Sequence, residues 1–201
     1  MNIACLDFEG VLVPEIWIGL AERTGIEALK VTTRDIPDYD ELMTYRLGLM
    51  DEHGLRFADI QAAADALEPL PGAAEFLHWL RGEFQVAILS DTFYELGGPL
   101  ARKLGDPMLL CHRLEVADDG RITGYRLRQP DPKRASVKAF RSLNYTILAA
   151  GDSYNDISML QEADYGVLFC PPDKVVADYP AFDVARDYAT LRDAFSRANR
   201  T

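Results

Sequence analysis

Three short apolar runs limit most strongly what this chain can fold into. They are Ile3 to Leu6, Val86 to Leu89 and Ile147 to Ala150, and segments with the hydrophobic spacing of helices lie between them. Apolar runs without polar alternation are typical of parallel strands that are buried on both faces. The segment from Gly72 to Phe84 has a helical apolar stripe and leads directly into the second run. The sequence therefore predicts an α/β fold with a parallel sheet between helices.

The pattern changes between Pro14 and Pro71, where no run looks like a strand. This part favours several short helices, including Ile16 to Arg23, Tyr39 to His53, and Ala58 to Leu67. We therefore predict a helical insertion after the first strand, formed by residues 14–70, on a core formed by residues 1–13 and 71–201. A hairpin between residues 114 and 127 and a closing helix from residue 188 to 199 complete the prediction.

Composition restricts the partners. The formal net charge of -11 argues against nucleic acid or an anionic membrane surface, because such partners select clustered Lys and Arg. No long apolar stretch suggests a membrane segment. Cys5, Cys111 and Cys170 are odd in number and widely spaced, which fits a reducing, cytoplasmic environment better than a disulfide framework.

Carboxylates follow two of the apolar runs. Asp7 and Glu9 come directly after the first, and Asp152 and Asp156, together with the amide of Asn155, come after the third. Ligands of open α/β sheets bind at the carboxyl ends of the strands. Crowded oxygen ligands repel one another unless a cation lies among them, and such ligands suit Mg²⁺. The alternatives are a helix-capping Asp and an Asx-rich turn.

Two further positions favour phosphate binding. Ser90 and Asp91 follow the second run, where a hydroxyl and backbone N–H groups can hold a phosphate oxygen. Lys133 follows Pro132, which suits the first turn of a helix, and its ammonium can point back toward the sheet. A helix N-cap is the commoner explanation for a residue such as Ser90 and an alternative for Asp91, and a lone Lys is usually solvated.

Together these motifs resemble the haloacid dehalogenase superfamily. Its four motifs match, in order, Asp7 to Val11, Ser90, Lys133, and Gly151 to Asp156. The resemblance implies a Rossmann-like core with a small cap. It implies that Asp7 is a nucleophile that passes through an aspartyl-phosphate, with Mg²⁺ held by Asp7, the Glu9 carbonyl and Asp152.

The resemblance also implies roles around the phosphate. Ser90 and Lys133 would hold the transferring phosphoryl oxygens, and Asp156 would order Lys133 or the water around the metal. Glu9 would protonate the leaving alkoxide and then deprotonate the acceptor. The usual family residue at this position is Asp, so the extra methylene of Glu9 is a departure that changes the geometry of proton transfer.

The cap residues narrow the substrate. Glu15 beside Arg46, which shares a helix face with Met43, can grip the ammonium and carboxylate of an amino acid; a surface ion pair is the alternative. The stretches 14–17 and 33–46 are similar to the bifunctional phosphoserine phosphatase/homoserine phosphotransferase subfamily. That likeness implies phosphoserine as donor, water or homoserine as acceptor, and contacts from Asn155 and from the backbone near Asp91 to the substrate.

Several alternatives stay open. Another small phosphomonoester can replace phosphoserine, and a catalytically silent binding module can share the fold. The choice between water and homoserine, and whether the chain forms a homodimer, are equally open. We expect His53, His78 and His112 to be structural, because none of them pairs with a motif in the sequence.

Overall fold

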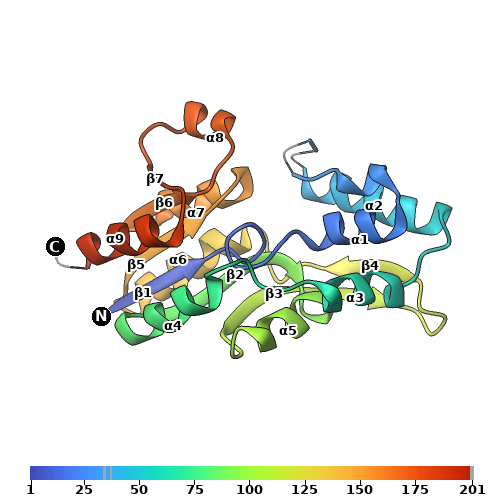
Figure 1. The fold of residues 1–201 in the computed structure, drawn as a ribbon, viewed down its shortest axis with the longest axis horizontal. Helices are drawn as coiled ribbons and strands as arrows, with labels where there is room; N and C mark the ends of the chain where they lie inside the picture. Colours follow the sequence, from blue (N-terminus) through green and yellow to red (C-terminus); the bar gives the residue numbers. More distant parts are fainter. Residues whose placement is uncertain (34, 37, 200–201) are drawn as a thin grey trace.

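A seven-stranded sheet forms the centre of the protein in a computed structural model that describes residues 1–33, 35–36 and 38–199 (Figure 1). The strand order is β4-β3-β2-β1-β5-β6-β7, and every neighbouring pair is parallel except β3 and β4. The strands are β1 Asn2–Leu6, β2 Gln85–Phe93, β3 Met108–Val116, β4 Ile122–Arg126, β5 Thr146–Gly151, β6 Tyr165–Phe169 and β7 Asp183–Ala185.

Helices cover both faces of the sheet. The helical elements are α1 Ile16–Thr24, η1 Glu27–Lys30, α2 Tyr39–Glu52, α3 Phe57–Ala66, α4 Ala73–Glu83, α5 Tyr94–Lys103, α6 Pro132–Ser142, η2 Tyr154–Asp156, α7 Ile157–Glu162, α8 Asp173–Asp178 and α9 Tyr188–Ala198. Side chains of β1 alternate between the faces, as the pleat requires. Ala4 and Leu6 pack toward α4, α5 and α9, whereas Ile3 and Cys5 pack toward α6, α7 and α8. The predicted α/β fold with a Rossmann-like parallel sheet is confirmed.

The insertion after β1 is helical, as predicted. Between residues 14 and 70, apart from positions 34 and 37, the structure has α1, η1, α2 and α3 and no strand. Figure 1 shows α1 and α2 beyond the carboxyl end of β1, with α3 beside α5. The division into a cap of residues 14–70 and a separate core stays a prediction. Arg34 and Pro37, part of the stretch that resembles the phosphoserine phosphatase subfamily, lie outside the described residues.

One predicted boundary differs from the structure. The strand expected to end at Leu89 continues as β2 to Phe93, with a shift of register against β3. Ser90 and Asp91 are therefore strand residues, and the N-cap of α5 is Phe93. The alternative that either residue caps a helix is wrong, because three polar residues, Ser90, Asp91 and Thr92, interrupt the apolar run without ending the strand.

No helix among the described residues is long and apolar enough to cross a membrane.

Candidate active site

The carboxyl ends of three neighbouring strands bring the predicted acidic residues together. β1 lies between β2 and β5, so Asp7 follows β1 at the same edge of the sheet where Asp152 follows β5. The backbone N–H of Asp7 donates to the carbonyl of Ala150 at 2.9 Å, which fixes the two strand ends against each other. The parallel topology thus gathers residues that are far apart in sequence.

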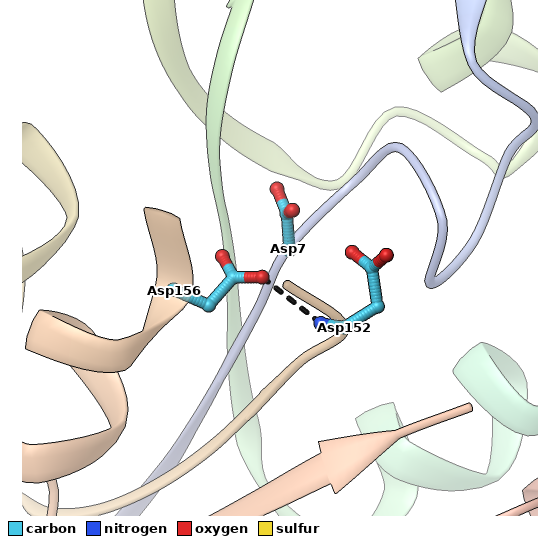
Figure 2. A group of neighbouring side chains, drawn as sticks. All are labelled: Asp7, Asp152 and Asp156. Atoms are coloured by element: carbon cyan, nitrogen blue, oxygen red, sulfur yellow. Dashed lines mark hydrogen bonds between the residues drawn. The ribbon is translucent and has the colours of Figure 1, made fainter. Parts of the chain in front are cut away.

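Asp7, Asp152 and Asp156 form a buried carboxylate cluster at this edge (Figure 2). One ligand atom from each lies within 4.8 Å of the others. Asp156 Oδ2 accepts hydrogen bonds from the backbone N–H groups of Asp152 and Ser153, at 2.9 and 3.1 Å. Asp156 closes a capping box with Ser153, so the turn also caps η2, in keeping with the Asx-turn alternative.

Lys133 places its ammonium group beside this cluster. It stands in the first turn of α6, directly after Pro132, and is almost fully buried. Its Nζ lies 2.6 Å from Asp156 Oδ1, 3.0 Å from Asp7 Oδ1 and 3.4 Å from Asp91 Oδ2. Burial alone would lower the pKa of Lys133, but these carboxylates outweigh it and raise the pKa well above its ordinary value. Lys133 therefore stays charged, and the alternative of a solvated surface Lys is wrong.

The cluster has more negative than positive charge. Burial, and then the charge of Asp156, raise the pKa of Asp7 well above its ordinary value, although Lys133 acts in the opposite direction. Asp7, Asp91 and Asp156 lie within 3.4 Å of the one ammonium, and Asp152 adds a fourth carboxylate beside Asp7 and Asp156. Buried carboxylates in such excess favour a bound cation, and a donor set made of oxygen alone suits a hard divalent ion.

The loop after β1 is shaped to approach this cluster. Gly10 has a φ of +80°, and a Cβ there would lie 2.6 Å from Cγ of Asp152. Only glycine allows the backbone of residues 9 and 10 to lie so close to that carboxylate. The arrangement fits the predicted metal ligands, which are the carboxylates of Asp7 and Asp152 and the backbone carbonyl of Glu9.

The side chain of Glu9 turns toward the first turn of α1. Glu9 Oε1 accepts a hydrogen bond from the backbone N–H of Ile16 at 3.1 Å. Burial, and then the charge of Glu15, raise the pKa of Glu9 to about 8. A carboxyl with this pKa is largely protonated at neutral pH, so it can donate a proton and take one back within a reaction cycle.

A cavity extends from the carboxylate cluster to the inserted helices. Its lining includes most of the predicted site residues, namely Asp7, Glu9, Glu15, Arg46, Ser90, Asp91, Asp152 and Asn155. Lys133 lines an adjoining cavity that shares Asp91 and Asn155 with the first, and Asp156 contacts Lys133 from the buried cluster. Ser90 is buried, and its Oγ accepts from the backbone N–H of Thr92 at 3.2 Å.

Arg46 lies at the far end of the cavity, on α2 with Met43, and both side chains are buried. Its Nη2 donates to the carbonyl of Val31 at 3.0 Å, and its guanidinium carbon lies 4.8 Å from the ring centroid of Trp17. Its Nε is buried with no hydrogen-bond partner among the described residues. A buried N–H without an acceptor costs stability, so this donor is a place where a ligand oxygen would be favourable.

A comparison with protein families shows to which family the chain belongs. Residues 1–164 match the model of the haloacid dehalogenase-like hydrolases. The chain belongs to this family. The superfamily predicted from the motifs is therefore confirmed.

Relatives of this hydrolase include curated and solved proteins. It is 60% identical over 199 residues to a protein of Pseudomonas aeruginosa named phosphoserine phosphatase ThrH, covering 99% of this chain and 97% of that one. A solved phosphoserine phosphatase from T. onnurineus has 28% identity and a TM-score of 0.74, over 96% of this chain and 92% of that chain. A structure titled "Phospho-Aspartyl Intermediate Analogue of Phosphoserine phosphatase" has 22% identity and a TM-score of 0.78, over 98% of both chains, and shows the same fold.

One expectation about the hydrolase is wrong. His112 was expected to pair with no motif, yet its Nε2 lies 3.5 Å from Asp91 Oδ1. His112 stands on β3 and reaches Asp91 because β2 continues past Leu89 alongside it. The sequence shows no signal for this contact, because His112 lies between Cys111 and Arg113 and at no fixed spacing from the motif that contains Asp91. The sequence likewise gives no signal that Trp17 packs against the guanidinium of Arg46.

Proposed function

We propose that this hydrolase is a phosphoserine phosphatase that requires Mg²⁺, forms an aspartyl-phosphate on Asp7, and also transfers the phosphoryl group to homoserine. The observation that carries the proposal is that one cavity is lined both by the carboxylate cluster and by Arg46. Asp7 and Asp152 of the carboxylate cluster line this cavity, with Lys133 3.0 Å from Asp7, and so does Arg46, whose buried Nε has no hydrogen-bond partner among the described residues. A small molecule with a phosphate at one end and a carboxylate at the other matches both sets of residues. The name of the 60% identical relative supports the same substrate.

Asp7 would attack phosphorus from a fixed position. Its Oδ1 accepts from the backbone N–H of Phe8 at 2.7 Å and lies 3.0 Å from Lys133, so the carboxylate cannot rotate freely. Its attack forms an acyl phosphate while the bond between phosphorus and the serine oxygen breaks. Lys133 and Ser90 would hold phosphoryl oxygens as charge develops on them. Mg²⁺, held by Asp7, Asp152 and the Glu9 carbonyl, would shield the charge between nucleophile and phosphate.

Glu9 would move the proton in both half-reactions. Its protonated carboxyl gives a proton to the leaving serine alkoxide and so becomes a carboxylate. It then takes a proton from the incoming water or homoserine hydroxyl, which attacks phosphorus and releases Asp7 as a carboxylate. A single group serves both steps, and Glu9 is restored at the end of the cycle.

The inserted helices would hold the amino acid. Arg46 would donate to the substrate carboxylate through Nε, while Glu15 accepts from the ammonium. Asn155 and the backbone near Asp91 would complete the pocket beside Ser90. The proposed division therefore assigns chemistry to residues 1–13 and 71–201 and substrate selection to residues 14–70.

The test measures both acceptors. The protein is incubated with Mg²⁺ and O-phospho-L-serine, with and without homoserine, and free phosphate and phosphohomoserine are quantified. We expect phosphate release that EDTA abolishes, and phosphohomoserine in the arm with homoserine. Absence of phosphate transfer to either acceptor would contradict the proposal. Hydrolysis of phosphoserine no faster than that of p-nitrophenyl phosphate would point to a different phosphomonoester.

A further inference from the structure

His112 is held in one tautomer by its surroundings. Its ring is buried on β3, with Tyr39 at a centroid distance of 5.9 Å and Phe93 at 6.3 Å. Its Nδ1 accepts a hydrogen bond from the backbone N–H of Arg128 at 3.2 Å, so this nitrogen carries no proton. The ring proton therefore lies on Nε2, which faces the Asp91 carboxylate at 3.5 Å.

Asp91 connects this imidazole to two groups of the active site. Its Oδ2 accepts from Asn155 Nδ2 at 2.8 Å and lies 3.4 Å from Lys133 Nζ. Asn155 is fixed at its other end, because its Oδ1 accepts from Ser153 Oγ at 2.6 Å. Burial raises the pKa of Asp91, but Lys133 and the hydrogen bonds from His112 and Asn155 together bring it well below its usual range. Asp91 is thus a buried anion within a continuous polar network.

The network limits how closely Asp91 approaches Lys133. Of the three carboxylates around Lys133, Asp91 is the farthest, at 3.4 Å against 3.0 Å for Asp7 and 2.6 Å for Asp156. Without a donor at its Oδ1, the Asp91 carboxylate would turn toward the ammonium to recover the lost interaction. Lys133 would then be drawn away from Asp7 and from a phosphoryl group bound there.

We propose that His112 is a positioning residue that acts through Asp91 to keep Lys133 directed at the phosphoryl group and Asn155 directed into the cavity. The inference rests on the proposed function, since it assigns Lys133 to the phosphoryl oxygens. Within this network, Lys133 would act on the phosphoryl group itself and not on the leaving group or the acceptor. The loss of His112 should therefore slow every phosphomonoester, because the phosphoryl group is common to all of them.

The first test replaces His112 and measures turnover with saturating Mg²⁺. His112→Phe keeps an aromatic ring between Tyr39 and Phe93 but removes the donor to Asp91. We expect its kcat to fall roughly ten- to a hundredfold for both phosphoserine and p-nitrophenyl phosphate, as for other groups that orient a reacting side chain. His112→Gln, whose amide N–H can reach Asp91, should restore most of the loss. His78→Phe, at an exposed position on α4, is the matched control and should keep wild-type rates.

A purely structural role predicts a different result. If His112 only supported Tyr39, whose hydroxyl donates to the Asp91 carbonyl at 2.8 Å, its loss would disturb α2 and raise the KM of phosphoserine alone. An unchanged kcat with a raised phosphoserine KM, or loss of activity in His112→Gln equal to that in His112→Phe, would overturn the proposal. If His112→Phe does not fold, the kcat values of His112→Gln and His112→Asn are compared instead. Because only the longer Gln side chain reaches Asp91, a lower kcat for His112→Asn supports the proposal, and equal kcat values overturn it.

A double-mutant cycle tests the route through Asp91. Asp91→Asn removes the anion that competes for Lys133, so adding His112→Phe to it should cause less than a twofold further loss. Independent, multiplied losses would contradict the inference. The same assay on wild-type protein separates the role of His112 from the proposed function. If wild-type turnover of phosphoserine requires Mg²⁺ but the double-mutant cycle shows no coupling, the role of His112 is overturned and the proposed function stands.

Discussion

Glu9 is the residue at which this hydrolase departs from the usual pattern of its family, and the structure gives the departure a physical reason. The longer side chain reaches the backbone N–H of Ile16, at the start of α1. The predicted acid and base is thereby connected to the first inserted helix. An Asp at this position is one methylene shorter and could not make the same contact without a shift of the loop.

The raised pKa of Glu9 predicts how stability without metal depends on pH. The folded state holds the Glu9 proton up to about pH 8, whereas the unfolded chain releases it near the ordinary value of 4.5. Glu9 therefore costs stability progressively as the pH rises between these values. Glu9→Gln, which keeps an acceptor for Ile16, should melt higher than wild type in EDTA at pH 8, by several degrees, and about equally at pH 4.5.

The same variant separates stability from catalysis. Because Gln cannot transfer a proton, phosphoserine turnover should fall by roughly two to four orders of magnitude. The melting difference is checked by calorimetry across the pH range. A difference that stays constant from pH 4.5 to pH 8 would show that Glu9 is not protonated in the folded, metal-free protein.

At the scale of elements, the loop between β1 and α1 depends on the close approach at Gly10. Gly10→Ala places a methyl group against Asp152 and strains a backbone with positive φ, at a cost of about 1–2 kcal/mol. We expect a weaker apparent affinity for Mg²⁺ in the phosphatase assay. Gly25→Ala is the matched control, since its φ is +73° and nothing lies within 4 Å of the added methyl group. Equal changes in the apparent affinity for Mg²⁺ in the two variants would show that the close approach at Gly10 does not contribute to metal binding.

Helix α2 provides the test of substrate selection. Arg46→Ala should raise the KM of phosphoserine by about ten- to a hundredfold, the value of one or two charge-assisted hydrogen bonds. The KM of p-nitrophenyl phosphate, which has no carboxylate, should change far less. Arg46→Lys tests the geometry, because an ammonium keeps the charge but lacks the Nε donor. Equal KM changes for the two substrates would contradict the assignment.

The elements also show why part of the site could be predicted and part could not. Asp7 and Asp152 directly follow strands, and the apolar pattern of those strands predicts where they lie. Lys133 is at the start of a helix, which Pro132 predicts. The contact of His112 with Asp91 depends on the register shift of β2 against β3. A local irregularity of register between two parallel strands leaves no mark in the spacing of residues along the chain, so no local pattern predicts that contact.

At the scale of the whole molecule, the carboxylate cluster links metal binding to stability. A ligand that binds only the folded state at about a hundred times its dissociation constant adds about 2.7 kcal/mol. For a chain of this length that corresponds to a rise in melting temperature of roughly 5–10 °C. We expect this rise with Mg²⁺ in wild-type protein and its loss in Asp152→Asn. Equal melting temperatures in Mg²⁺ and EDTA would show that the cluster binds no Mg²⁺.

The most direct test of the account is a search for phosphate on Asp7 during turnover. The protein is mixed with O-phospho-L-serine and Mg²⁺, quenched in acid within the first turnover, and digested for mass spectrometry. We predict one added phosphoryl group on the peptide that contains Asp7, and neither adduct nor turnover in Asp7→Asn. Steady hydrolysis of phosphoserine with no adduct on Asp7, or substantial turnover by Asp7→Asn, would contradict the central claim.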